Sequence, residues 1–236
     1  IVTRMDSFSL LPETSPGAHA SLTSVIAVLA AAKALGDNMH AFEKAANASD
    51  RRVIFAFFHG ESFDYIGSSR WVHDVINDRF PMPYFADSYT ENLERLTLEQ
   101  LESVVEVQQL SAKTSLYAHV DGKSFEKGGE KVKTIVDTLK TAAAPSGGML
   151  HATGMSSRSV LPPSSLHSIL KARRDVPAVL IAPFEKQYEE RMLASPWDEL
   201  RSEDVAETVK VISAVGRGLA RAAAAHSGMS AQESDA

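Results

Sequence analysis

One segment, Arg52–His59, constrains the fold more than any other because it is nearly apolar along its whole length (RVIFAFFH). A strand with one face in water alternates apolar and polar residues, whereas a strand covered on both faces does not. This run therefore predicts a central strand in a sheet that helices cover on both sides. An α/β architecture follows, in which the rest of the chain supplies the covering helices.

Short apolar runs alternate with segments of helical period along the whole chain, as in α/β proteins. Besides Arg52–His59, the predicted strands are Ile1–Met5, Ser103–Leu110, Leu116–Val120, Met149–Ala152 and Ala178–Ala182. The predicted helices are Ala18–Leu35, Ile66–Asn77, Glu126–Ala144, Pro163–Arg173 and Ser202–Ala225. Surface loops are predicted at Asn38–Asp50, Pro81–Thr90 and Ala144–Arg158. No break divides the chain into two cores, so we expect one domain over residues 1–226 and a flexible tail over 227–236.

Composition removes several classes of function. The 236 residues include no cysteine, which excludes cysteine-based zinc sites, thiol nucleophiles and disulfides. A net charge of -6 argues against a basic surface for nucleic acid. No signal peptide is visible, and the most apolar stretch, Val25–Ala32, is far shorter than the ~20 residues that cross a bilayer. The first residues have the pattern of a strand already under way, so we expect a fragment of a longer protein.

The common catalytic motifs are missing. There is no G-x-S-x-G elbow, dinucleotide-binding or P-loop glycine pattern, or H-E-x-x-H. The H-x-E of His59–Glu61 lacks the P-C-x-x-C partner of a zinc deaminase. Spacing alone leaves a Ser-His-Asp triad open, but nothing points to one. The other histidines are scattered and mostly beside polar residues, so solvated positions are predicted for them; they are His19, His40, His73, His119, His151, His167 and His226.

The most informative segment is Phe55–Arg70 (FAFFHGESFDYIGSSR). A buried strand ends at His59, Gly60 lets the backbone turn, and Asp64 precedes a predicted helix. Ligands bind at the carboxyl ends of the strands in open α/β sheets, so these polar residues are candidates for a site. The alternative is that Asp64 only caps the helix, which contributes ~1 kcal/mol. The residues by themselves leave both interpretations open.

At this segment the chain resembles the nicastrin family. The family motif D-Y-I-G-S stands intact as Asp64, Tyr65, Ile66, Gly67 and Ser68. Four further segments resemble the family in the same order along the chain: Met5–Ser24, Ser103–Leu110, Leu161–Arg173 and Val211–Ala224.

The resemblance implies a fold and a setting. Nicastrin is the large glycosylated subunit of γ-secretase, and its ectodomain has the fold of zinc aminopeptidases. The expected fold is thus a three-layer α/β/α domain with a mostly parallel mixed sheet. The implied partners are presenilin, which carries the protease active site, the two small membrane subunits, and the N-terminal ends of shed type I membrane proteins. The implied location is lumenal or extracellular, on a single-pass protein whose membrane span lies outside this chain. The sequon at Asn47 is an expected glycosylation site in a predicted loop.

The same resemblance implies that the zinc site has degenerated. Arg4 stands where the active enzymes carry a histidine, although Asp6 remains, and Ala20 stands where they carry the bridging aspartate. Glu61 keeps the position of the general base, but Ser62 replaces the next ligand. Glu106 matches a further acidic position more loosely, and no histidine lies between His167 and His226 for the last ligand. We therefore expect no catalytic residue, no metal and no cofactor.

The predicted substrate-binding residues are Glu61 and the motif Asp64, Tyr65, Ile66, Gly67 and Ser68. One family interpretation has Glu61 pair with the free amine of a shed substrate. The other is steric: the lobe excludes long ectodomains while the motif supports folding and assembly, and we favour it. Two rivals are a divergent zinc-dependent aminopeptidase or carboxypeptidase of the same fold, and an assembly module that never contacts substrate.

Overall fold

The computed structural model describes residues 1–8, 12–14, 16–81, 95–112, 115–143, 149–153, 155–188, 190–193 and 195–229. The predicted loop Pro81–Thr90 therefore lies outside the described residues except for Pro81. Much of the predicted loop Ala144–Arg158 is described, and it contains the strand at Met149–Ala152 that was also predicted.

The centre of the molecule is a six-stranded sheet in the order β2-β1-β3-β6-β4-β5. The strands are β1 (Val2–Arg4), β2 (Ala56–Phe58), β3 (Val104–Val107), β4 (Ser115–His119), β5 (Met149–Ala152) and β6 (Ala178–Ala182). Neighbouring strands are parallel except for the antiparallel pair β4 and β6. The predicted mostly parallel mixed sheet is confirmed, and each predicted strand lies where its apolar run indicated.

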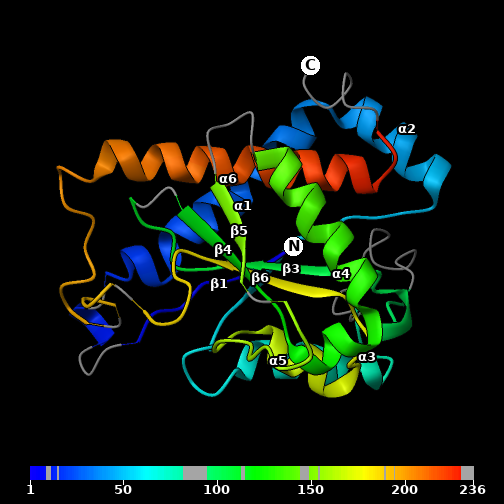
Figure 1. Cartoon of the computed structure of the whole chain (residues 1–236), viewed down its shortest axis with the longest axis horizontal. Coiled ribbons are helices and arrows are strands. Elements are labelled where there is room, and N and C mark those ends of the chain that lie inside the picture. Colours follow the sequence, from blue (N-terminus) through cyan, green and yellow to red (C-terminus); the bar gives the residue numbers. More distant parts are fainter. Residues whose placement is uncertain are drawn as a thin grey trace, which may run out of the picture.

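Helices cover both faces of the sheet (Figure 1). On one face lie α1 (Thr23–Asp37), α4 (Gly122–Ala143) and α6 (Val205–His226), and on the other α3 (Ile66–Ile76) and α5 (Leu166–Ala172). Each layer encloses its own apolar cluster against the sheet. Three short turns complete the order: Pro12–Thr14 and Leu98–Gln100 are 3₁₀ turns, and Ala18–Leu22 is a π-turn that leads into α1.

The predicted loop at Asn38–Asp50 is wrong, because this segment forms the helix α2 (Met39–Ser49). Phe42, Ala45 and Ala46 share one face at helical spacing, and Phe42 and Ala45 pack against the larger apolar cluster. The helix ends at Asp50, whose φ of 53° is left-handed. Asn47 therefore lies exposed on a helix rather than in a loop.

The described start of the expected tail, residues 227–229, is partly buried. Ser227 is fully buried, and Met229 is 7% exposed and belongs to the larger apolar cluster. The Ser49 hydroxyl donates to the Ser227 carbonyl at 2.9 Å, which joins α2 to this segment. Residues 230–236 lie outside the described residues.

The segment Ala18–Asp37 is long and apolar enough, by length and composition, to cross a membrane. This apolar segment is longer than the stretch Val25–Ala32 on which the sequence argument rested. In the structure it is a core helix, because Ala27, Val28 and Ala31 are fully buried. Gly216 of α6 lets the two helices approach: a Cβ there would lie 2.9 Å from the Ala30 Cβ.

Candidate functional site

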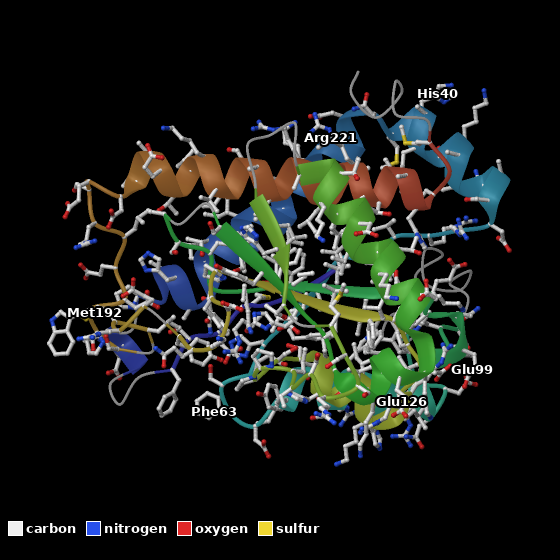
Figure 2. The ribbon with its side chains drawn as sticks, in the orientation of Figure 1. His40, Phe63, Glu99, Glu126, Met192 and Arg221 are labelled. Carbon is white, nitrogen blue, oxygen red and sulfur yellow. The ribbon has the colours of Figure 1, made fainter. Side chains whose placement is uncertain are left out.

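The turn between β2 and α3 carries the motif. Gly60 has a φ of 83°, and Asp64 and Tyr65 have φ values of 58° and 59°. Two consecutive residues other than glycine in the left-handed region mark a strained turn, a feature that is common at functional sites. Phe63 in this turn is 54% exposed, and Figure 2 shows it at the edge of the molecule.

Glu61, rather than Asp64, satisfies the start of α3. Asp64 is exposed, and the N-cap residue Tyr65 makes no side-chain capping bond. Instead the backbone N–H of Ser68 donates to Glu61 Oε1 at 2.7 Å. A carboxylate is favourable at a helix N-terminus, where free N–H groups and the helix dipole meet. The interpretation that Asp64 caps the helix was therefore wrong: a carboxylate does accept an N–H group at the start of α3, but it belongs to Glu61.

Gly67 is required by the close approach of α3 to the end of β2. A Cβ on Gly67 would lie 2.3 Å from the His59 carbonyl oxygen and 3.0 Å from Glu61 Oε1. The next residue, Ser68, is fully buried, and its hydroxyl lies 2.8 Å from that of Ser168 on α5. The spacing between motif and strand thus has a packing cause. Ile66, at 58% exposed, and Asp64 are the members that face solvent.

Asp6 holds the first part of the same turn. Its carboxylate accepts the backbone N–H of Glu61 at 2.9 Å and that of Ser62 at 2.8 Å. Burial acts to raise the pKa of Asp6, but the hydrogen bonds from Ser62 and Glu61 and the charge of Arg4 outweigh it and leave that pKa lowered. Asp6 is therefore a structural anion that fixes the Glu61–Ser62 peptide.

Glu106 accepts the backbone N–H groups at the start of α5, as Glu61 does at the start of α3. It is fully buried and accepts the Ser164 hydroxyl at 2.6 Å and the backbone N–H groups of Leu166 at 3.2 Å and Ser165 at 3.3 Å. Burial raises the pKa of Glu106, and these hydrogen bonds oppose the rise only in part. The predicted acidic position is thus bound to the start of a helix.

Arg4 supplies the positive charge of this cluster. It is the last residue of β1. Its charge helps to lower the pKa of Asp6, whereas burial raises the pKa values of Tyr65, Glu106 and Tyr188 and the charge of Arg4 only opposes that rise. Its Nε is buried and has no hydrogen-bond partner in the structure. A guanidinium is permanently charged, so it balances the carboxylates at every physiological pH.

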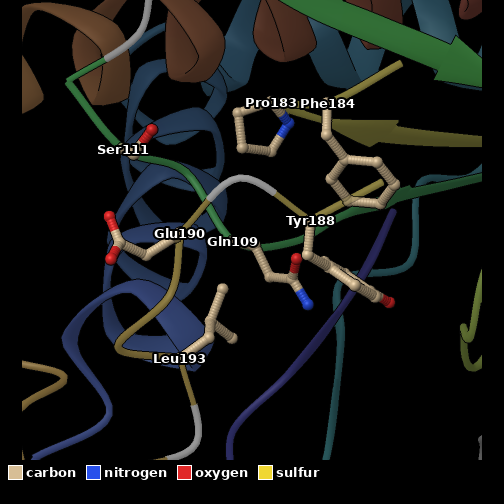
Figure 3. A pocket seen from close by; sticks show the side chains of 7 residues that line it. All are labelled: Gln109, Ser111, Pro183, Phe184, Tyr188, Glu190 and Leu193. Carbon is tan, nitrogen blue, oxygen red and sulfur yellow. The ribbon is translucent and has the colours of Figure 1, made fainter. Parts of the chain in front are cut away.

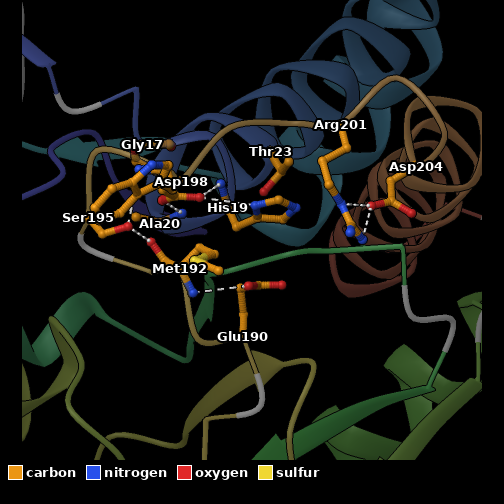
Figure 4. A network of polar contacts seen from close by, with 12 residues as sticks. Gly17, His19, Ala20, Thr23, Glu190, Met192, Ser195, Asp198, Arg201 and Asp204 are labelled. Carbon is orange, nitrogen blue, oxygen red and sulfur yellow. Dashed lines mark hydrogen bonds and ion pairs between the residues drawn. The ribbon is translucent and has the colours of Figure 1, made fainter.

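The sequence analysis missed a second network, around Asp198 (Figure 4). This fully buried carboxylate accepts the backbone N–H of His19 at 2.9 Å and that of Ala20 at 3.0 Å, and it contacts His19 Nδ1 at 3.0 Å. Ala20 is buried beside it. The network ties the π-turn before α1 to a loop 179 positions away in the chain.

Two histidines correct the expectation of solvated positions. His19 is 7% exposed and His119 is 4% exposed. His119 Nε2 lies 2.8 Å from the Phe184 carbonyl oxygen, and burial lowers the pKa of His119. Two features of the sequence could have predicted their burial: His19 lies just before a predicted helix, and His119 lies in a predicted strand, at the end of β4.

The structure thus brings Arg4, Asp6, Glu61, Ser62 and Glu106 together with the start of α3, at the carboxyl ends of β1, β2 and β3. Asp64 and Ile66 are exposed beside them. Within the described ranges there is no group of three or more histidine and acidic side chains arranged to hold a metal ion.

His19 makes stability depend on pH. Its hydrogen bond to Asp198 raises the pKa of His19; burial opposes this, and the charges of Asp198, Glu190 and Asp204 assist it. Because the folded-state pKa exceeds the ordinary value of about 6.5, the stabilisation is complete below about pH 6.5 and is lost as the pH rises through the folded-state value. We expect the free energy of unfolding, measured with urea from pH 6 to 8, to fall less steeply for His19→Asn. The exposed His40→Asn control should keep the wild-type slope.

The fold and the site first define a class of protein. The structure matches the LapA aminopeptidase of Legionella pneumophila with a TM-score of 0.52 at 11% identity, over 93% of this chain and 50% of that one. It matches the crystal structure of the γ-secretase component nicastrin with a TM-score of 0.68 at 20% identity, over 94% of this chain and 39% of that one. The chain therefore has an aminopeptidase-like α/β fold.

The family follows from the sequence comparisons. The family model described as the nicastrin large lobe matches residues 1–226. Nicastrin of Caenorhabditis elegans is 34% identical over 99% of this chain, and nicastrin of Mus musculus is 33% identical over 93% of it. The chain belongs to the nicastrin family. It spans about a third of the length of these relatives, 32% and 31% respectively.

Proposed function

We propose that this chain is the non-catalytic large lobe of a nicastrin ectodomain and forms one domain over residues 1–226. The observation that carries the proposal is the engagement of its acidic residues. Asp6, Glu61 and Glu106 each accept backbone N–H groups where the metal-binding side chains of an aminopeptidase would be expected. Their hydrogen bonds fix the turn before α3 and satisfy backbone N–H groups at the starts of α3 and α5.

The residues present do not fit the two zinc ions of an aminopeptidase. Such a site needs histidine and carboxylate ligands that hold the metals about 3.5–4 Å apart and a free carboxylate base. Here the side chains at the positions inferred from the family are Arg4, Asp6, Ala20, Ser62 and Glu106. The fixed charge of Arg4 would repel a dication, and the two carboxylates are already hydrogen-bonded.

Zinc should therefore neither co-purify with the protein nor stabilise it. Elemental analysis after purification without chelator is expected to find far less than one zinc per chain, and added zinc should leave the melting temperature unchanged. One tightly bound equivalent of zinc would contradict the proposal. Hydrolysis of an aminoacyl chromogenic substrate in the presence of zinc would support the rival, a divergent aminopeptidase or carboxypeptidase.

Within γ-secretase we propose a steric and structural role for the lobe. It would sit in the lumenal or extracellular space beside presenilin and the two small membrane subunits, where its bulk excludes type I membrane proteins that keep long ectodomains. Glu61 then serves to position α3, consistent with its 2% exposure and its bond to Ser68. Asn47, exposed on α2, is the proposed glycan acceptor.

Glu61→Gln separates this role from amine recognition. The glutamine carbonyl can still accept the Ser68 N–H, so the fold and complex maturation are expected to persist while the charge is removed. We expect processing of short-ectodomain substrates by the assembled complex to remain within about twofold of wild type. A selective loss of processing with normal maturation would contradict the steric role.

Amine recognition remains the second candidate because of one observation. Glu61 Oε2 is buried and has no hydrogen-bond partner in the structure, so it has capacity for a donor. A carboxylate that pairs with an ammonium group in a desolvated site forms a strong hydrogen bond. Crosslinking of a substrate N-terminus near Glu61 would support this candidate and argue against a module that never contacts substrate.

A further inference from the structure

A row of lysines runs along α4, in a part of the molecule that the candidate site does not use. Lys123, Lys127 and Lys131 are exposed and recur every four residues, so they follow one another along the helix at about 6 Å per step. The helix is kinked at Gly128, where a Cβ would lie 3.6 Å from the Asp175 carbonyl oxygen. This contact sets α4 beside the segment that follows α5.

The end of α5 and the segment after it add two basic side chains. Lys171 is exposed and Arg174 is half-buried. A hydrogen bond from Arg173 lowers the pKa of Asp175, and the charge of Lys127 adds to that effect, which agrees with a position of Lys127 close to this segment. We call the following five side chains the basic face: Lys123, Lys127, Lys131, Lys171 and Arg174.

The charge of the basic face is not neutralised within the part of the chain that the structure describes. None of its five side chains forms an ion pair there. Two nearby acids have other partners, because Asp175 pairs with Arg173 at 3.3 Å and Glu130 pairs with Lys133 at 2.8 Å. Glu126 comes one residue before a lysine of the row, which turns it about 100° round the helix. The face is therefore positive, although the whole chain has a net charge of -6.

The opposite side of the molecule differs in charge. The cavity shown in Figure 3, where β3 and β6 end, is lined by Glu190 and, among the described residues, by no lysine or arginine. Figure 2 places Met192, two positions after Glu190, and Glu126 of α4 on opposite sides of the molecule. A polyanion would therefore be attracted to the basic face rather than to the side that carries the cavity.

The side chains of the basic face indicate the kind of anion. Four of the five are lysines, which present hydrated point charges rather than the planar fork with which arginine holds a single carboxylate. A protein partner is bound mainly through aromatic and apolar anchors, whereas all five members of this face are charged. A linear polymer with closely spaced anionic groups gains affinity instead from many weak contacts and from the release of counterions.

We propose that the basic face binds a linear sulfated polysaccharide. Its sulfate groups pair with Lys123, Lys127 and Lys131 along α4, and with Lys171 and Arg174 beside them. This function goes beyond the steric role. The choice of a polysaccharide over nucleic acid rests on the proposed lumenal or extracellular location, whereas the positive charge of the face does not depend on that location.

The test is a calorimetric titration of the full chain with size-selected heparin, a linear sulfated polysaccharide. We expect saturable binding whose Kd rises by about tenfold or more between about 50 mM and about 200 mM NaCl, because counterions are released on binding. Dextran of the same length, which carries no charge, should not bind.

The triple variant Lys123→Gln, Lys127→Gln and Lys131→Gln should raise the Kd for heparin by about tenfold or more and flatten its dependence on salt. Glutamine is a good helix former and these positions are exposed, so the melting temperature should stay at the wild-type value. Arginine at the same three positions keeps the charge and should keep the binding.

A matched control removes the same charge elsewhere. Lys33→Gln, Lys44→Gln and Lys210→Gln together change three exposed lysines on α1, α2 and α6. This triple variant has the same net charge as the first one, so a Kd within about twofold of wild type would locate binding on the basic face rather than on overall charge.

Two further ligands decide the class of polyanion. Desulfated heparin keeps its carboxylates but loses its sulfates, and poly-glutamate is an acidic polymer of protein; both should bind more weakly than heparin. Equal binding of either polymer, an unchanged Kd in the triple variant on α4, or the same loss in the control variant would overturn the proposal. These outcomes leave the steric role standing, because that role is tested by substrate processing in the assembled complex.

Discussion

Gly67→Ala is expected to destabilise the chain strongly. The new methyl group would lie 2.3 Å from the His59 carbonyl oxygen, which belongs to the backbone at the end of β2 and cannot move away as a side chain would. Overpacking of this kind costs ~1–3 kcal/mol, and more where the neighbour is rigid. At roughly 2–4 °C per kcal/mol for a chain of this size, the melting temperature should fall by about 5 °C or more.

Gly36→Ala is the matched control. A Cβ at Gly36, near the end of α1, would meet nothing within 4 Å. Alanine is favoured over glycine in a helix by ~1 kcal/mol, so this variant should keep or raise the melting temperature. If Gly67→Ala behaved like Gly36→Ala, the close approach of α3 to β2 would be refuted.

Asp198→Ala is expected to have the other large effect. The change leaves the backbone N–H groups of His19 and Ala20 and the His19 ring without their buried acceptor. Loss of one partner from a buried charged network typically costs ~3–5 kcal/mol. Denaturant unfolding should report a loss of that order, with the first turn of α1 losing amide hydrogen-exchange protection.

Glu199→Ala is the control for this variant, since Glu199 is the exposed neighbour of Asp198. Surface changes away from special features stay within ~0.5 kcal/mol. A loss for Asp198→Ala no greater than that of Glu199→Ala would show that the network does not hold the π-turn.

The family motif was visible in the sequence, but the tasks of its members were not. The alternation of apolar runs located all six strands, and Gly60 was correctly expected at the turn. The helix cap, in contrast, was considered only for Asp64, as one of two open interpretations, because that residue precedes the predicted helix. Glu61 performs it from seven positions before Ser68, since the left-handed Asp64 and Tyr65 fold the turn back on itself.

The helix α2 shows a different cause of error. Its polar residues outweighed the apolar face made by Phe42, Ala45 and Ala46, so the segment resembled a loop. That face packs onto the larger apolar cluster, which stabilises a helix too short to be stable alone. Most of its residues, such as Ala41, Glu43 and Lys44, are also strong helix formers, so packing and propensity act together.

The sequence by itself determined the α/β class, the strand positions, the family and the absence of thiol chemistry, because these depend on residue types and local periodicity. Only the tertiary structure decided which carboxylate meets which N–H group. Asp198 and His19 are 179 positions apart, and Glu106 reaches Ser164 from 58 positions away. Such pairs form because buried polar groups must find partners once the chain is packed, and no local pattern encodes that choice.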